Sequence, residues 1–173
     1  MIIIGFPGIG KTTLSKTKIT DIVDLESSYF SKENINWYKA YCQAAECISY
    51  QGYYVFISSH IENLYYLHNN NIANVICIYP SINLKDKWIS KLEERYEKSK
   101  LEKDLRALKT VQKFYTTDIL NFKNTHNYDT KIGFFEITQM DYNLKNIVEN
   151  IHQAFVSISF ANLNNGIFTI GRQ

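Results

Sequence analysis

MIIIGFPGIGKTT, residues 1–13, opens the chain, and in it an apolar β-branched run leads directly into glycines, a lysine and two threonines. Residues 5–12 match G-x-x-x-x-G-K-[ST], the pattern of a phosphate-binding loop. Backbone N–H groups must approach a triphosphate closely in such a loop, and side chains would block that approach. Gly8 and Gly10 leave the space open and allow unusual φ values. The stretch therefore predicts a buried strand, a phosphate-binding loop and the start of a helix.

Each part of the motif has an expected role in binding a nucleotide. The backbone N–H groups of the loop would surround the phosphates, and the positive end of the following helix would face them. These backbone groups belong to Gly8, Ile9, Gly10, Lys11, Thr12 and Thr13. Lys11 can reach the β- and γ-phosphates of ATP, and the Thr12 hydroxyl can coordinate Mg²⁺. The alternative is a glycine-rich strand-to-helix turn that holds no ligand.

Length and composition fit one globular domain. The chain has 173 residues, of which 45% are hydrophobic and 21% are charged, and both shares are ordinary for a soluble protein. No apolar run approaches the ~20 residues of a membrane span, and no secretory signal is recognisable, so we expect a cytoplasmic protein without a membrane partner. A net charge of +2 argues against a protein that coats nucleic acid. No pattern indicates an oligomeric state.

The three cysteines, Cys42, Cys47 and Cys77, have no C-x-x-C spacing, and we expect them to be small buried side chains in a reducing compartment. The histidines form no H-x-x-x-H pair, which argues against a zinc site.

Continuous apolar runs alternate with helical patterns along the chain. The expected strands are residues 1–4, 22–25, 53–58, 75–79 and 132–137. Helical spacing is expected at residues 37–48, 61–68, 84–120 and 144–158, and residues 121–130 read as a polar loop. Continuous runs are typical of parallel strands covered on both faces. We therefore predict an α/β fold whose ligand lies at the carboxyl ends of the strands.

The chain contains no internal repeat, low-complexity segment or linker, so residues 1–158 are expected to form one domain. Residues 159–173 would be a tail, in which residues 167–170 are either an added edge strand or unstructured.

These features resemble the nucleoside and nucleotide kinase branch of the P-loop proteins, and above all the small nucleotide kinases encoded in phage genomes. The similarity is carried by residues 5–12 (GFPGIGKT), 24–28 (DLESS), 55–60 (VFISSH) and the helix at 88–95. It implies a three-layer αβα P-loop fold with a five-stranded parallel sheet in the order 2-3-1-4-5. A helical lid, at about residues 91–110, would be inserted after strand four.

The same resemblance implies an activity. Members of this group use their Walker A loop, ATP and Mg²⁺ to move the γ-phosphoryl group to a small acceptor, here most simply a (deoxy)nucleoside monophosphate. Two other functions stay open. A polynucleotide 5′-hydroxyl kinase on the same fold would need a basic track, which the low net charge does not favour. A nucleotide-binding module without transfer is the other alternative.

Strand three departs from the family pattern, because it ends in Ser58, Ser59 and His60 and lacks the usual Walker B aspartate. Some small-molecule kinases carry a D-x-D/E pair at the end of strand two, and residues 24–26 (DLE) look like that pair. The resemblance then implies that Asp24 holds a Mg²⁺-bound water and that Glu26 orders the acceptor. Both would face the site if the strand ran through Glu26. The alternative is a solvated strand end.

Two further groups could contact the substrates. Phosphoryl transfer relies on guanidinium groups, and Arg95 and Arg106 fall in the expected lid, where an unbroken helix would put them on one face with Lys91 and Lys98. A solvated helix face is the other possibility. Ser59 and His60 follow strand three, where an acceptor could bind. For His60 an ordinary hydrogen-bonded histidine is the competing interpretation.

Overall fold

The computed structural model describes residues 1–17, 21–128 and 131–164. It divides into two compact units, Met1–Tyr142 and Asn143–Gln173. In its described part the second unit holds α6 (Leu144–Asn164), which runs further than the helix predicted to end at residue 158. The segment 167–170 lies outside the described residues. Within the described ranges, no helix is both long enough and apolar enough to cross a membrane.

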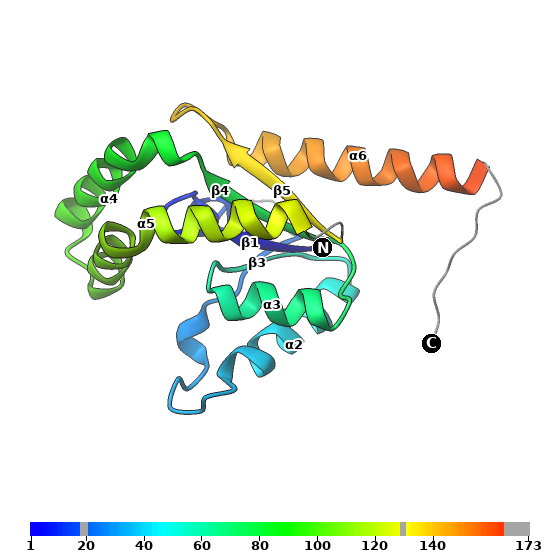
Figure 1. Ribbon diagram of the computed structural model, residues 1–173, viewed down its shortest axis with the longest axis horizontal. Helices are drawn as coiled ribbons and strands as arrows, with labels where there is room; N and C mark the ends of the chain where they lie inside the picture. Colours follow the sequence, from blue (N-terminus) through cyan, green and yellow to red (C-terminus); the bar gives the residue numbers. More distant parts are fainter. Residues whose placement is uncertain (18–20, 129–130, 165–173) are drawn as a thin grey trace. The chain divides into compact units, whose positions relative to one another are not determined.

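The first unit is built on a sheet of parallel strands. They are β1 (Ile2–Gly5), β2 (Ile22–Asp24), β3 (Tyr54–Ser58), β4 (Val75–Pro80) and β5 (Ile132–Ile137). Their order is β2-β3-β1-β4-β5, and every neighbouring pair is parallel, which confirms the predicted α/β fold and its strand order (Figure 1). Gly5 pairs in register with Ser58, so the loop after β1 begins beside the end of β3.

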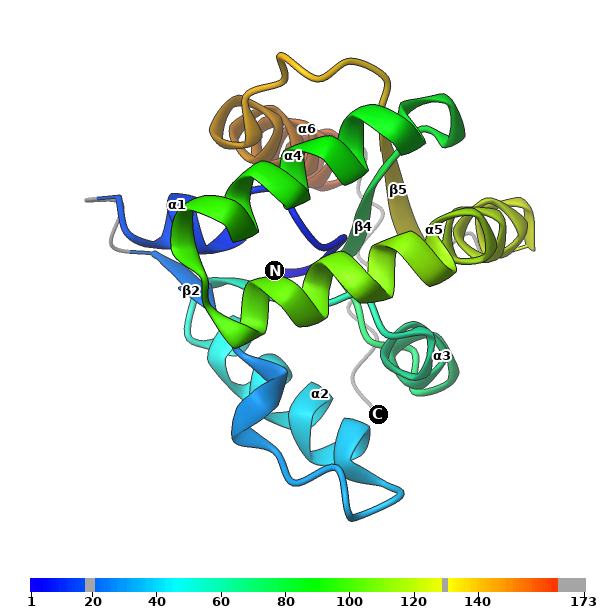
Figure 2. The same cartoon turned by 90° about the vertical axis from the view of Figure 1, so that its left-hand side faces the viewer.

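Helices cover both faces of this sheet. They are α1 (Lys11–Ser15), α2 (Trp37–Tyr50), α3 (Ile61–Asn69), α4 (Lys85–Ser99) and α5 (Glu102–Tyr128), with short 3₁₀ turns η1 (Ser27–Tyr29) and η2 (Ile82–Leu84). In Figure 2, α2, α3 and α5 lie on one side of the sheet and α1 lies on the other. Right-handed crossovers place helices on opposite faces of a parallel sheet when the chain changes the direction in which it adds successive strands.

The core explains why the first strand is a continuous apolar run. Ile2, Ile3 and Ile4 are each 0% exposed, because β1 is central and covered on both faces. Phe6, which follows the strand, makes edge contacts with Trp88 of α4 and with Tyr115 of α5. The phosphate-loop motif therefore begins inside the core. Cys42 and Cys77 are buried as predicted, but Cys47 is exposed, so its predicted burial is wrong.

The segment after β4 is a helical hairpin and not the unbroken helix on which the expected basic face depended. Lys100 separates α4 from α5 in the left-handed conformation, with φ 53°, and its N–H donates to Tyr96 O at 2.7 Å. A left-handed residue with this hydrogen bond is a common way to end a helix, although glycine usually fills the position. The hairpin therefore turns at a lysine and not at a glycine.

The polar loop predicted at residues 121–130 is wrong for most of its length, because α5 continues to Tyr128. Phe122 extends the buried stripe formed by Tyr115 and Ile119, and it is only 1% exposed. One buried apolar side chain per turn holds the helix on the sheet although the rest of this stretch is polar.

Candidate functional site

The phosphate-binding loop has the backbone conformation that its glycines were expected to allow. Gly8 has φ 88° and Gly10 has φ 103°, values that side-chain-bearing residues rarely adopt. A Cβ atom on Gly8 would lie 3.0 Å from Leu92 Cδ2 and 3.1 Å from Trp88 Nε1. Gly8 is thus required both by its φ value and by the close packing of α4 against the loop.

Lys11 lies at the loop's end as the first residue of α1. Its Nζ donates to Gly5 O, and to Phe6 O at 3.3 Å, so backbone carbonyls of the loop hold the ammonium. Burial lowers the pKa of Lys11 to about 8, although Asp24 and Glu26 act in the opposite direction. A cation that is largely removed from water in this way is suited to bind an anion, because a bound phosphate would supply the negative charge that compensates the ammonium.

The lowered pKa of Lys11 predicts how the stability of the protein depends on pH. Between about pH 8 and 10.5 the folded protein gives up the Lys11 proton while the unfolded chain retains it, so the free energy of unfolding rises with pH in that window. We expect the Tm of the wild type, measured relative to Lys11→Met, to rise by a few degrees between pH 7 and 10, at roughly 2–4 °C per kcal/mol for this size. Thermal melts at several pH values measure it.

Lys16→Met, which removes an exposed lysine of the same segment, is the matched control and should show no such trend. A Tm difference that stays flat, or that falls as the pH rises, would contradict the buried ammonium.

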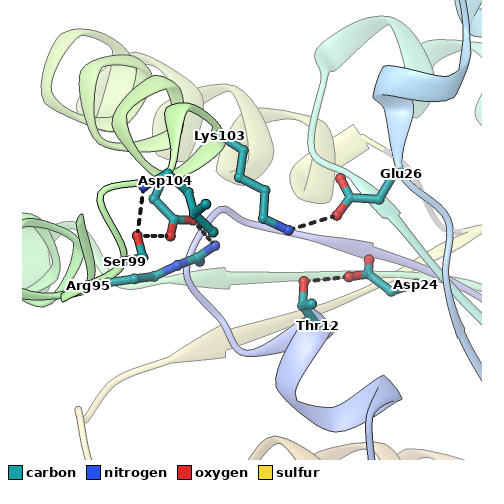
Figure 3. Close-up of polar contacts among 8 residues, drawn as sticks. Thr12, Asp24, Glu26, Arg95, Ser99, Lys103 and Asp104 are labelled. Atoms are coloured by element: carbon teal, nitrogen blue, oxygen red, sulfur yellow. Dashed lines mark hydrogen bonds and ion pairs between the residues drawn. The ribbon is translucent and has the colours of Figure 1, made fainter. Parts of the chain in front are cut away.

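Thr12 and Asp24 are brought together as predicted for a metal site. The Thr12 hydroxyl donates to Asp24 Oδ2 at 2.6 Å (Figure 3). One residue begins α1 and the other ends β2, so their contact depends on the tertiary fold. Mg²⁺ is commonly held by one or two protein oxygens together with phosphates and waters, and this pair fits that donor set. Within the described residues no group of three or more His, Cys, Asp or Glu side chains could hold a metal by itself.

Glu26 lies outside β2, which ends at Asp24, so the condition under which Asp24 and Glu26 would face the site from one strand is not met. Its carboxylate still reaches the site, since its charge partly opposes the lowering of the Lys11 pKa by burial and it lies 3.7 Å from Lys103 Nζ (Figure 3). Lys103 belongs to the first turn of α5. The ion pair therefore joins the hairpin to the segment after β2, and Lys103 is a cation of the site that the sequence did not single out.

Helix α4 is fastened to the backbone of the loop at two points. Trp88 Nε1 donates to Pro7 O at 2.8 Å. Lys91 Nζ donates to the Tyr142 hydroxyl at 3.0 Å, and that hydroxyl donates to Ile9 O at 3.0 Å. The Trp88 and Tyr142 rings stack with an interplanar angle of 8°. The first turns of α4 thus pack directly against the phosphate-binding loop.

The two arginines of the hairpin lie in different surroundings. Arg95, on α4, pairs with Asp104 (Figure 3), and its charge contributes to the lowered pKa of both Lys11 and Lys91. Arg106, on α5, is 68% exposed and lies 3.9 Å from Glu102 of the same helix. Because the hairpin turns at Lys100, the two arginines do not share a helix face. The charge of Arg95 thus acts on the loop lysine, whereas Arg106 lies on the helix surface.

The end of β3 carries no carboxylate, and its polar atoms meet neighbouring elements. The Ser58 N–H donates to the Tyr41 hydroxyl at 2.8 Å, and that hydroxyl donates to Leu25 O at 2.7 Å. Asn63 Nδ2 donates to Ser58 O at 2.9 Å. Tyr41 thus joins the ends of β2 and β3 and fixes the backbone that positions Asp24.

Ser59 and His60 follow β3, with His60 at the N-cap of α3. The His60 ring packs edge-on against Trp37 with centroids 5.1 Å apart, and its Nε2 lies 3.5 Å from Lys32 Nζ. Burial, followed by the charge of Lys32, lowers the pKa of His60. His60 therefore lies against Trp37, which also contacts Tyr41, and these three rings form an aromatic wall at the edge of the site.

No family model, curated protein or solved structure matches this chain. Its function is therefore inferred from the geometry of its own residues. At the carboxyl edge of the sheet these residues supply a loop cation, a hydroxyl–carboxylate pair, an arginine from α4 and a half-buried aromatic wall.

Proposed function

We propose that the chain is an ATP-dependent phosphotransferase that moves the γ-phosphoryl group to a small acceptor, most simply a (deoxy)nucleoside monophosphate. The observation that carries this proposal is the Thr12–Asp24 contact of 2.6 Å beside a loop whose backbone carbonyls accept hydrogen bonds from the Lys11 ammonium. A ligand-free structural turn needs neither feature. A nucleotide-binding loop needs both, because a triphosphate with its metal carries opposite charges side by side.

In the proposed reaction the bond between Pγ and the ADP oxygen breaks as a bond forms between Pγ and an acceptor oxygen. Lys11 would contact the β- and γ-phosphates and Arg95 would contact the transferring group, so that both stabilise charge in the transition state. Thr12 and Asp24 are the residues that would hold Mg²⁺, which when bound neutralises charge on the β- and γ-oxygens. No covalent intermediate with the protein is required.

A monophosphate acceptor agrees with the residues at the end of β3. The acceptor phosphate already carries an anionic oxygen near neutral pH, so no strand-three carboxylate is needed to remove a proton. Planar groups lie next to that region, since Trp37 contacts both Tyr41 and His60. Aromatic rings stack on bases, and Lys32, 4.8 Å from the Trp37 ring centroid, could meet the phosphate.

One observation favours a second function, a nucleotide-binding module that transfers nothing. The strand that carries the Walker B aspartate in the resembling kinases ends here in Ser58, whose carbonyl and N–H are used by Asn63 and Tyr41. Such a module would bind ATP and Mg²⁺ and release no ADP.

Incubation of the protein with labelled ATP and a panel of mononucleotides, nucleosides and 5′-hydroxyl oligonucleotides tests the proposal. We expect ADP and a nucleoside diphosphate to form with at least one mononucleotide. Transfer confined to oligonucleotide ends would instead support a polynucleotide kinase. ATP binding without ADP release under any condition would support the module.

The two lid arginines predict different effects on this activity. Arg95→Ala should lower kcat by on the order of 10²-fold with a smaller effect on the KM for ATP, because a charge near the transferring group is lost. Arg106→Ala, which removes an exposed charge from the same hairpin, should change kcat less than about twofold. Steady-state kinetics compares them, and equal effects of the two substitutions would contradict the assignment.

A further inference from the structure

Asp104 is a buried acid in the first turn of α5. It is 3% exposed, and among the described residues it is the one Asp, Glu, Lys, Arg or His in the buried class. A buried carboxylate is stable only when it is paired and hydrogen-bonded, because desolvation strongly disfavours its charge. Its partners therefore indicate what the carboxylate does.

Both oxygens of Asp104 have a donor from α4 (Figure 3). Oδ1 accepts from Arg95 Nη2, and Oδ2 accepts from the Ser99 hydroxyl at 2.5 Å. The Ser99 oxygen in turn accepts from Leu101 N–H at 3.2 Å, which ties the group to the turn of the hairpin. Burial raises the pKa of Asp104, but the hydrogen bonds from Ser99 and Arg95 and the charges of Arg95 and Lys103 together lower it, and the net pKa lies below its usual value.

Arg95 lies on α4 one helical turn after Lys91. Lys91 in turn is connected to the phosphate-binding loop, because its ammonium donates to the Tyr142 hydroxyl and that hydroxyl donates to Ile9 O. The Arg95 side chain is 42% exposed, so part of its guanidinium faces solvent although Nη2 is fixed by Asp104. The guanidinium has five N–H donors in a planar fork, which leaves it able to bind a phosphate oxygen while paired.

We propose that Asp104 is a positioning residue that holds the Arg95 guanidinium toward the phosphate-binding loop, where it distinguishes a nucleoside triphosphate from a diphosphate. This inference rests on the proposed nucleotide binding and deepens it. An arginine on a solvated helix samples many rotamers, and fixing them before binding removes part of the entropic cost of ordering the side chain when the ligand binds. The rigid pair thus prepares a contact for the terminal phosphate.

The hairpin offers a matched control in Glu102 and Arg106. They form a second carboxylate–guanidinium pair in the hairpin, separated by 3.9 Å, but both are solvated, at 72% and 68% exposed. Such pairs contribute little, so Glu102→Gln removes an acid from the same helical turn without affecting Arg95.

Calorimetric titration of the full chain with ATP and with ADP, each with Mg²⁺, tests the inference. We expect the wild type to bind ATP more tightly than ADP. Asp104→Asn should weaken ATP binding about tenfold and ADP binding less than twofold, whereas Glu102→Gln changes neither. In an Arg95→Ala background Asp104→Asn should add nothing, because the positioned group is absent.

Ser99→Ala keeps the test decisive if Asp104→Asn does not fold, and it should reduce the ATP preference about threefold. The inference is overturned if Asp104→Asn or Ser99→Ala leaves the ATP-to-ADP ratio unchanged, if Glu102→Gln alters it equally, or if the wild type does not prefer ATP. A wild type that binds ATP but transfers nothing overturns only the kinase activity. A wild type that binds no nucleotide overturns both.

Discussion

Lys11→Met is expected to lower kcat/KM for phosphoryl transfer by about 10³-fold or more while the protein keeps its fold. Backbone carbonyls of Gly5 and Phe6 hold the Lys11 ammonium inside the loop, where a dry surrounding strengthens its attraction to phosphate oxygens. Methionine keeps an unbranched side chain of similar length, so the packing beside Gly5 is preserved and the charge is the variable.

The measurement is the initial rate of ADP formation with the acceptor that the panel identifies, together with the circular dichroism spectrum. Lys16→Met, which removes an exposed lysine after α1, should retain wild-type rates. Turnover of Lys11→Met within tenfold of the wild type would show that the loop does not bind the transferring phosphates.

Asp24→Asn is expected to lower kcat by about 10²–10³-fold and to raise the Mg²⁺ concentration needed for half-maximal rate. Asparagine preserves the shape of the side chain but removes its negative charge. It can still accept the hydrogen bond from Thr12, which is 2.6 Å long in the wild type. A neutral oxygen orients metal-bound water less strongly than a carboxylate does. Metal-free nucleotide binding should persist, since the loop amides and Lys11 are unchanged.

Titration of the rate with Mg²⁺, and of nucleotide binding with and without the metal, separates the two effects. Asp86→Asn provides the control, because Asp86 is an exposed aspartate in the first turn of α4. If Asp24→Asn has the metal titration of the wild type, the Thr12–Asp24 pair is not a metal site.

The sheet could be predicted because its strands are local and strongly patterned. Runs such as residues 1–4 and 75–79 are continuous and apolar, and each is followed by glycine or proline. Such a pattern favours a buried strand over a helix or a loop. The loop motif is also local, and its φ values at Gly8 and Gly10 follow from residue type. Asp24 was found near Thr12 because the end of every parallel strand lies at one edge of the sheet.

Contacts between distant residues could not be predicted in the same way. Tyr142 reaches Ile9 O from beyond β5, and Lys103 reaches Glu26 from the hairpin, and neither contact has a periodic signal. Lys100 adopts φ 53° although its type gives no preference for that conformation. Asp104 reads as one of many surface acids until the fold buries it beside Arg95.

The hydrogen bond from Trp88 to Pro7 O gives the protein an intrinsic optical reporter. Indole fluorescence responds to hydrogen bonding and to nearby charge, and Trp88 has both the loop carbonyl and the Lys91 ammonium, 4.9 Å from its ring centroid. The sequence contains two tryptophans, and the other, Trp37, contacts His60 on the proposed acceptor side. Trp37→Phe and Trp88→Phe thus yield two single-tryptophan proteins, in which emission follows occupancy of the nucleotide side and of the acceptor side separately, without an attached dye.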